Sequence, residues 1–294
     1  MNDRQAASAA GWSEPKPTAV LVLADGTVLE GTGFGATGRA VGEVCFNTAM
    51  TGYQEILTDP SYAGQIITFT FPHIGNVGTN DEDIETVNMA ATPGARGVIL
   101  HSAITNPSNF RSTRHLDQWL KSRGVIGLAG IDTRALTSLI RTKGMPNAVI
   151  AHAPDGAFDL AVLAKEAREW PGLVGMDLVP MVTSAQRFGW DETPWVWEKG
   201  YGRQEAPGSA PPFHVVAIDY GIKRNILRQL AGTGAKVTVV PATTSASDIL
   251  ALSPDGIFLS NGPGDPAATG AYAVPVIKEL IAKGLPTFGI CLGH

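Results

Sequence analysis

The sequence contains little cysteine, no long apolar run and no cluster of basic residues. Cys45 and Cys291 are the only cysteines among 294 residues. Two such distant thiols do not make a disulfide framework, and this scarcity suits the reducing cytoplasm. No apolar run reaches the roughly 20 residues that cross a bilayer. With a net charge of −5, the chain is not expected to bind nucleic acid either.

The composition favours two folded domains. A chain of 294 residues, of which 44% are hydrophobic, is long enough for two cores. Residues 1–17 are rich in alanine, serine and proline and contain no apolar cluster, so we expect a mobile tail. Residues 184–212 hold three tryptophans among glycine, proline and charged residues. This composition indicates a connector that is partly held against a surface.

Residues 18–183 predict an α+β domain, because strand-like and helical segments are mixed without regular alternation. Residues 47–65 are polar and are expected to form a loop. Residues 33–38 read Gly-Phe-Gly-Ala-Thr-Gly, the letters of a dinucleotide-binding fingerprint. That fingerprint requires a following helix, whereas residues 41–46 are typical of a strand. We therefore interpret these glycines as turn residues.

Residues 213–294 predict an α/β domain with a doubly wound, flavodoxin-like parallel sheet. Four strand patterns, at 215–218, 236–240, 256–259 and 286–290, alternate with three helical patterns. In such sheets, ligands bind beyond the carboxyl ends of the strands. Glycine-rich segments follow the third and the fourth strand, so we expect both segments to lie at this edge.

The segment after the fourth strand, Gly289-Ile-Cys-Leu-Gly293, has the form of a nucleophile elbow. A glycine on each side of Cys291 lets the backbone turn sharply. A helix starting there would favour the thiolate through its free N–H groups and its dipole. The alternative is a small core residue, because free cysteine is among the most buried residue types.

The segment after the third strand reads Ser260-Asn-Gly-Pro-Gly-Asp-Pro266. The first proline fixes one φ angle, and the two glycines allow the main chain to approach a ligand closely. Such a loop could aim amide N–H groups at an oxyanion. An ordinary turn would have the same composition, but the expected position beside Cys291 favours a functional loop.

These two segments resemble those of the class I, triad-type glutamine amidotransferases. Longer stretches, at 47–62, 72–80, 131–134 and 219–226, resemble the glutamine-hydrolysing small subunits of carbamoyl phosphate synthetases. The resemblance covers nearly the whole chain after the tail. It implies a small-subunit N-terminal domain followed by an amidotransferase domain.

The resemblance also implies a reaction and the residues that perform it. Cys291 would attack the side-chain amide of glutamine, release ammonia and form a thioester that water hydrolyses. The N–H groups of Leu292 and Gly262 would form the oxyanion hole. Ammonia would pass to a large synthetase subunit that uses ATP, magnesium and bicarbonate, while no cofactor or metal is expected in this chain. Glutamine would be bound by Ser61, Gly262, Gly264 and Leu292.

The end of the sequence departs from the family pattern. The family's catalytic histidine and glutamate lie well beyond the nucleophile, whereas the sequence ends at His294. His294 matches the motif histidine beside the elbow, and the other histidines are expected to be structural or exposed. We therefore expect an incomplete amidotransferase domain in a longer molecule. Two alternatives stay open: an amidotransferase of another pathway, and a non-catalytic module that docks the large subunit.

Overall fold

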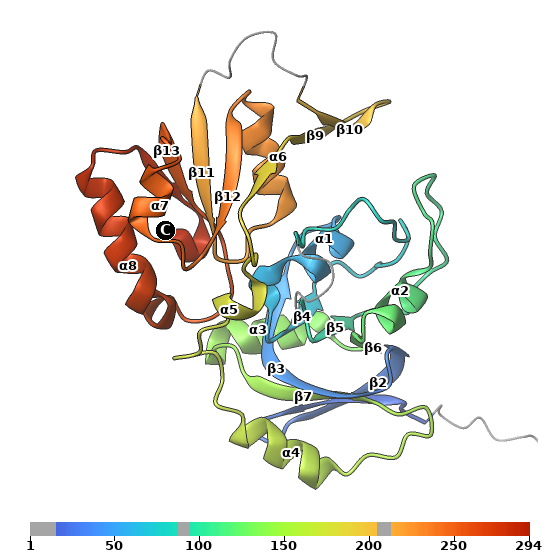
Figure 1. The fold of residues 1–294 in the computed structure, drawn as a ribbon. Helices are drawn as coiled ribbons and strands as arrows, with labels where there is room; N and C mark the ends of the chain where they lie inside the picture. Colours follow the sequence, from blue (N-terminus) through green and yellow to red (C-terminus); the bar gives the residue numbers. More distant parts are fainter. Residues whose placement is uncertain (1–15, 88–93, 205–212) are drawn as a thin grey trace, which may run out of the picture.

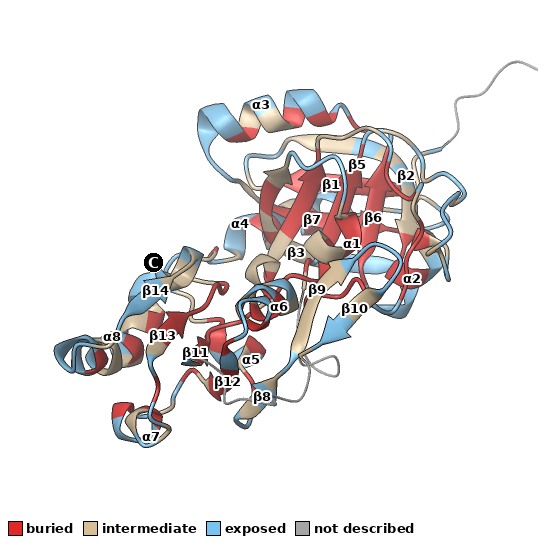
Figure 2. Cartoon of the chain, turned by 90° about the horizontal axis from the view of Figure 1, so that it is seen from above, coloured by how far each residue is buried: buried red, intermediate tan, exposed pale blue. Residues whose placement is uncertain are grey.

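The computed structural model describes residues 16–87, 94–204 and 213–294, which form a barrel domain and a sheet domain (Figure 1). Most of the tail predicted for residues 1–17 lies outside the described residues. Within them, every helix is too short or too polar to cross a bilayer. Buried residues gather in the barrel strands and in the middle of the sheet, as Figure 2 shows.

The barrel domain is built on seven strands that close in the order β1-β2-β6-β5-β4-β3-β7. The neighbours β3, β4, β5 and β6 are parallel to one another, and the remaining pairs are antiparallel. The strands are β1 (Ala19–Leu23), β2 (Val28–Gly35), β3 (Gly38–Asn47), β4 (Gln65–Phe69), β5 (Gly97–Leu100), β6 (Ile126–Ala129) and β7 (Asn147–His152).

Strand β1 consists only of apolar residues because helices pack against the barrel on both of its sides. All five residues of β1 are buried, because alternate side chains serve two cores. Leu21 shares a core with Leu136 of α3, whereas Val20 packs with Leu163 of α4. The helices of this domain are α1 (Tyr53–Thr58), the 3-10 turn η1 (Pro60–Tyr62), α2 (Leu116–Ser122), α3 (Thr133–Lys143), α4 (Leu160–Glu169) and α5 (Val179–Val182).

The sheet domain has five strands in the order β14-β13-β11-β12-β8. β8 is antiparallel to its neighbour, and the other strands are parallel. Helix α6 covers one face, where Leu227 packs with Ala217, whereas Leu280 of α8 packs with Ile218 on the other face. The elements are β8 (Phe188–Trp190), β11 (His214–Asp219), α6 (Arg224–Gly232), β12 (Lys236–Pro241), α7 (Ala246–Leu250), β13 (Gly256–Leu259), α8 (Pro266–Ala282) and β14 (Thr287–Gly289).

The segment predicted as a connector, residues 184–212, contains three short strands in its described part. β8 extends the edge of the sheet, whereas β9 (Glu192–Val196) and β10 (Gly200–Arg203) form a hairpin. The connector is also held against the barrel domain, because the guanidinium of Arg111 lies 5.5 Å from the ring centroid of Trp195. The domain limits themselves stay predictions.

Several expectations can be compared with this fold. A mixture of strands and helices in the first domain and parallel strands in the second are confirmed. The rejection of a dinucleotide fingerprint at residues 33–38 is supported, because β2 passes directly into β3 without a helix. The interpretation of these glycines as turn residues is wrong, since Gly33 and Gly35 lie in β2 and Gly38 begins β3. The loop expected at residues 47–65 is wrong, since α1 and η1 lie there. Helix α1 begins after Gly52 with no side-chain cap, so the usual sequence signal for its start is missing.

Candidate active site

Cys291 lies in a sharp turn directly after β14. Its φ angle is +56°, a left-handed conformation that non-glycine residues adopt uncommonly. A strained turn of this kind lifts a nucleophile above the edge of a sheet in nucleophile elbows. Among the described residues Cys291 is exposed, which favours a nucleophile over the alternative of a small core residue.

The two glycines that flank Cys291 are required by close packing. A Cβ atom on Gly289 would overlap the carbonyl oxygen of Gly293, and one on Gly293 would overlap the carbonyl oxygen of Leu259. The turn is therefore pressed against the end of β13. After Cys291 the structure has a 3-10 turn, η2 (Cys291–Gly293). Within the described residues, the helix that the sequence predicts to start at Cys291 is therefore only this 3-10 turn.

The loop after β13 lies beside this elbow. A Cβ atom on Gly262 would be 2.8 Å from Cδ2 of Leu292 and would overlap the carbonyl oxygen of Tyr220. Only glycine allows such a close approach. The two glycine-rich segments that the sequence placed at one sheet edge are thus neighbours in the structure.

Gly264 is held by a segment of the chain that precedes the sheet domain. It forms a β-bridge with Asp177, and its φ angle is +89°. The N–H of Asp265 donates to the carbonyl of Met176 at 2.9 Å. In return, the N–H of Gly175 donates to Oδ2 of Asp265 at 2.7 Å. This N–H group, together with that of Ala267, lowers the pKa of the Asp265 carboxyl.

Ser61 reaches the same loop from the barrel domain. It lies in η1, where Oδ1 of Asp59 accepts the N–H of Ser61 at 2.9 Å and caps the turn. The side-chain amide of Asn261 donates to Oγ of Ser61 at 2.8 Å. Ser61 is therefore in hydrogen-bond contact with the residue that immediately precedes Gly262, as a site made from two domains requires.

An ion pair supports this contact between the domains. Nζ of Lys223 lies 3.3 Å from Oδ2 of Asp59. Burial lowers the pKa of Lys223, but the Asp59 carboxylate outweighs burial, so the pKa is raised above its ordinary value. Lys223 therefore stays charged at neutral pH, and the Asp59 side chain is fixed between it and the η1 turn.

The histidines other than His294 are engaged in structural contacts or exposed, as expected. Nδ1 of His101 and Nδ1 of His152 each lie 3.0 Å from a main-chain carbonyl oxygen. His115 caps α2, His73 is exposed, and Nε2 of His214 lies 2.8 Å from Oγ1 of Thr238. Among the described residues, no three or more His, Cys, Asp or Glu side chains are grouped as a metal site requires.

Asp59, Asn261 and Lys223 received no role from the sequence, although each lies inside a motif that was singled out. Their polar side chains in loop segments were a signal, because loop residues often carry function. The pairing of Asp59 with Lys223 joins residues 164 positions apart. Such a pair cannot be found from local patterns.

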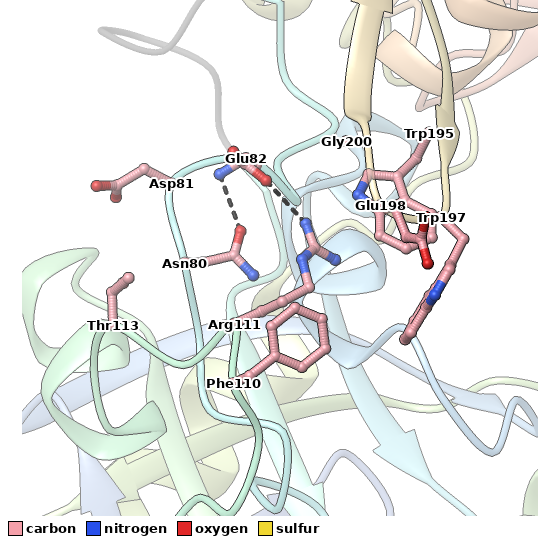
Figure 3. Close-up of a pocket in the computed structure, with 10 residues that line it drawn as sticks. All are labelled: Asn80, Asp81, Glu82, Phe110, Arg111, Thr113, Trp195, Trp197, Glu198 and Gly200. Carbon is pink, nitrogen blue, oxygen red and sulfur yellow. Dashed lines mark hydrogen bonds and ion pairs between the residues drawn. The ribbon is translucent and has the colours of Figure 1, made fainter.

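A separate pocket, of about 800 Å³, lies between the barrel domain and the β9–β10 hairpin (Figure 3). Its aromatic side chains stack edge to face, with ring centroids 6.1 Å apart for Phe110 and Trp197. Arg111 forms an ion pair with Glu82 at its side. None of the site residues predicted from the sequence lines this pocket.

Comparisons with known proteins agree with both domains. The family model described as "Carbamoyl-phosphate synthase small chain, CPSase domain" matches residues 21–150, and "Glutamine amidotransferase class-I" matches residues 216–294. A carbamoyl phosphate synthase small chain from Bradyrhizobium diazoefficiens is 79% identical over 283 residues, which are 96% of this chain and 70% of the relative. Small chains from Mesorhizobium japonicum and Agrobacterium fabrum are 69% and 68% identical, over 96% and 97% of this chain and 70% and 71% of theirs.

A solved structure is much less similar. An aminopeptidase from Aneurinibacillus sp. strain AM-1 aligns with a TM-score of 0.28 and 11% identity, over 84% of this chain and 57% of its own. That likeness is too weak to support any argument. The sequence relatives and the two family matches decide the assignment. The chain belongs to the carbamoyl-phosphate synthase small chain family, and its second domain is of the class-I glutamine amidotransferase type.

Proposed function

We propose that this chain hydrolyses glutamine through a thioester on Cys291 and delivers the ammonia to a large synthetase subunit. The observation that carries the proposal is the exposed Cys291 in a left-handed elbow between two glycines. A thiol held in this way is accessible to a substrate and is fixed by its backbone. The family membership supplies the substrate, glutamine, and the partner.

The neighbouring residues would take the remaining roles. The thiolate sulfur of Cys291 would attack the side-chain amide carbon of glutamine, and the N–H groups of Leu292 and Gly262 would stabilise the oxyanion. The family's catalytic histidine would protonate the leaving nitrogen, so that the intermediate collapses and expels ammonia, and water would then release glutamate from the thioester. The proximity of Gly262 to Leu292 supports this pairing of donors. Glutamine itself would be held by Ser61, Gly262, Gly264 and Leu292.

The partner would complete the reaction. We propose that the large subunit uses ATP, magnesium and bicarbonate to convert the ammonia into carbamoyl phosphate, so this chain would need no cofactor of its own. We also propose that β11 to β14 belong to a doubly wound, flavodoxin-like sheet. The domain limits 18–183, 184–212 and 213–294 and a cytoplasmic location likewise stay proposals.

The alternatives differ in what they predict. An amidotransferase of another pathway is not supported, because residues 21–150 match the domain of the small chain itself. A non-catalytic docking module would bind the large subunit but leave glutamine intact. Docking alone does not require an exposed cysteine with a left-handed backbone. This feature of Cys291 therefore favours catalysis over a docking module.

Replacement of the nucleophile tests the proposal. Cys291→Ser in the full-length protein, assembled with the large subunit, should lower glutamine hydrolysis by about 10³-fold or more. Synthesis from added ammonia should continue at the parental rate, because it bypasses the thioester. Cys45→Ala is the matched control and should keep full hydrolysis, since Cys45 is buried in the barrel domain. Glutamate release by Cys291→Ser at the parental rate would contradict the proposal.

A further inference from the structure

Asn261 links the two halves of the proposed glutamine site. It lies between β13 and Gly262, and only 2% of the residue is exposed. Its amide nitrogen Nδ2 donates to Oγ of Ser61 at 2.8 Å and to the carbonyl of Gly221 at 2.9 Å. A longer contact of 3.4 Å reaches Oδ1 of Asp59. Both hydrogens of the amide group are thus engaged.

The orientation of this amide is fixed by its backbone partners. The N–H of Lys223 is only a donor and lies 3.3 Å from Oδ1 of Asn261. The carbonyl of Gly221 is only an acceptor, so the nitrogen has to face it. A flipped amide would place its NH2 group against the N–H of Lys223 and its oxygen against the carbonyl oxygen of Gly221. The group that faces Ser61 is therefore the N–H donor.

This orientation decides what the Ser61 hydroxyl offers to a ligand. Because Asn261 donates to it, Oγ of Ser61 accepts, and its own hydrogen is left for another partner. Within residues 16–87, 94–204 and 213–294, the Ser61 hydroxyl has no acceptor. Ser61 is half-buried and its backbone is held by Asp59, so Oγ is in place before glutamine arrives.

We propose that Asn261 is a positioning residue that presents the Ser61 hydroxyl as a hydrogen-bond donor to glutamine. The inference rests on the proposed function, in which Ser61 binds glutamine. Asn261 touches Ser61 and not the reacting atoms, so its effect on the substrate passes through Ser61. Without its amide, the hydroxyl rotates freely and turns its hydrogen toward the Asp59 carboxylate or water. Glutamine then loses the preorganised hydrogen bond.

A double-mutant cycle on the KM for glutamine separates this role from a merely structural one. The full-length protein, assembled with the large subunit, is assayed as the parent, Ser61→Ala, Asn261→Ala and the double variant. Ser61→Ala should raise KM about tenfold in the parent. In the Asn261→Ala background, the same change should raise KM no more than about twofold, because the hydrogen bond is already lost.

Two controls keep the cycle interpretable. Asn147→Ala removes an asparagine amide that donates to the carbonyl of Trp170 at 3.0 Å, within the barrel domain. In that background, Ser61→Ala should keep its full effect on KM. Synthesis from added ammonia shows whether each variant is folded and assembled. If Asn261→Ala does not fold, Asn261→Leu takes its place, since it fills a similar volume but has no amide to donate to Ser61.

The outcomes distinguish the inference from the function on which it rests. An equal effect of Ser61→Ala, about tenfold in both backgrounds, would mean that Asn261 acts independently, and it would overturn the inference alone. A parent that does not hydrolyse glutamine, or a Ser61→Ala variant with unchanged KM, would overturn the assignment of Ser61 and the inference with it. Loss of the Ser61 effect only in the Asn261 backgrounds supports the inference.

Discussion

At the residue scale, the candidate site depends on the absence of a side chain at Gly293. A Cβ atom there would lie 2.6 Å from the carbonyl carbon of Leu259 and would also overlap its oxygen. The backbone at the end of β13 cannot yield without disturbing the loop that contains Gly262. The constraint at this residue is therefore the close approach of two chain segments.

Gly293→Ala should displace the elbow and lower both stability and glutamine hydrolysis. Overpacking of this kind costs about 1–3 kcal/mol of unfolding free energy. The control is Gly189→Ala in β8, where the nearest atom to an added Cβ is 3.9 Å away. Urea unfolding and a glutaminase assay measure the two effects. Equal stability and activity in both variants would show that the elbow tolerates a side chain.

At the scale of elements, one carboxylate ties α2 to the barrel. Oδ1 of Asp117 in the first turn of α2 accepts the N–H of Gly35 at the end of β2, at 2.7 Å. Its other oxygen accepts from Nζ of Lys121 at 2.6 Å. Burial raises the pKa of Asp117, but Lys121 and the N–H of Gly35 outweigh burial and lower it below 3.8.

This lowered pKa predicts a pH-dependent contribution to stability. A carboxyl whose pKa is lower in the folded state stabilises the fold above its unfolded pKa and loses this effect as the pH falls. Asp117→Asn should therefore cost about 1 kcal/mol at neutral pH. The difference from the parent should shrink below pH 3.8. Unfolding curves at several pH values test this, and a cost that is constant with pH would contradict the assignment.

Local patterns predicted the elements whose signals lie within a few residues. Asp132 and Gly144 bracket α3, and the structure has both residues as its caps. Helix α8 starts at Pro266, where the side chain of Asp265 caps it, so the end of the segment 260–266 that the sequence predicts as a loop already belongs to the helix. Barrel closure could not be predicted, since it depends on pairing between strands far apart in sequence.

The candidate site was predictable in its motifs and not in its contacts. Gly262 and Leu292 follow neighbouring parallel strands, so their proximity followed from the strand order. Ser61 came only from the family resemblance, because no pattern around residues 59–62 points to the other domain. The hydrogen bond from Asn261 to Ser61 joins residues 200 positions apart. Only the packing of the two domains brings them together.

At the scale of the whole molecule, Arg228 joins three segments. It lies on α6, and its side chain is only 2% exposed. It pairs with Glu192 of β9 and lies 3.9 Å from Oε1 of Glu85, which belongs to the barrel-domain segment. Its guanidinium also sits 3.8 Å from the ring centroid of Tyr201. The two domains and the hairpin thus share one buried cation.

Arg228→Met should destabilise the whole molecule by about 3–5 kcal/mol, because it removes the cation that pairs with the buried Glu85 and the half-buried Glu192. The control is Arg203→Met, which breaks an exposed ion pair with Asp191 and should cost less than about 1 kcal/mol. Denaturant unfolding followed by tryptophan fluorescence measures both. Similar small costs in the two variants would mean that Arg228 does not hold the domains together.

The left-handed backbone of Cys291 lowers the stability of the fold, although the proposed reaction needs a cysteine at this position. For an L-residue this conformation costs about 1–2 kcal/mol, out of a total folding stability of about 5–15 kcal/mol. Glycine would relieve that cost and would also remove the sulfur. Selection for heat resistance alone would therefore tend to replace the proposed nucleophile, and only a need for its sulfur would retain it. The proposed nucleophile thus stands at a position where the native residue is not the most stable choice.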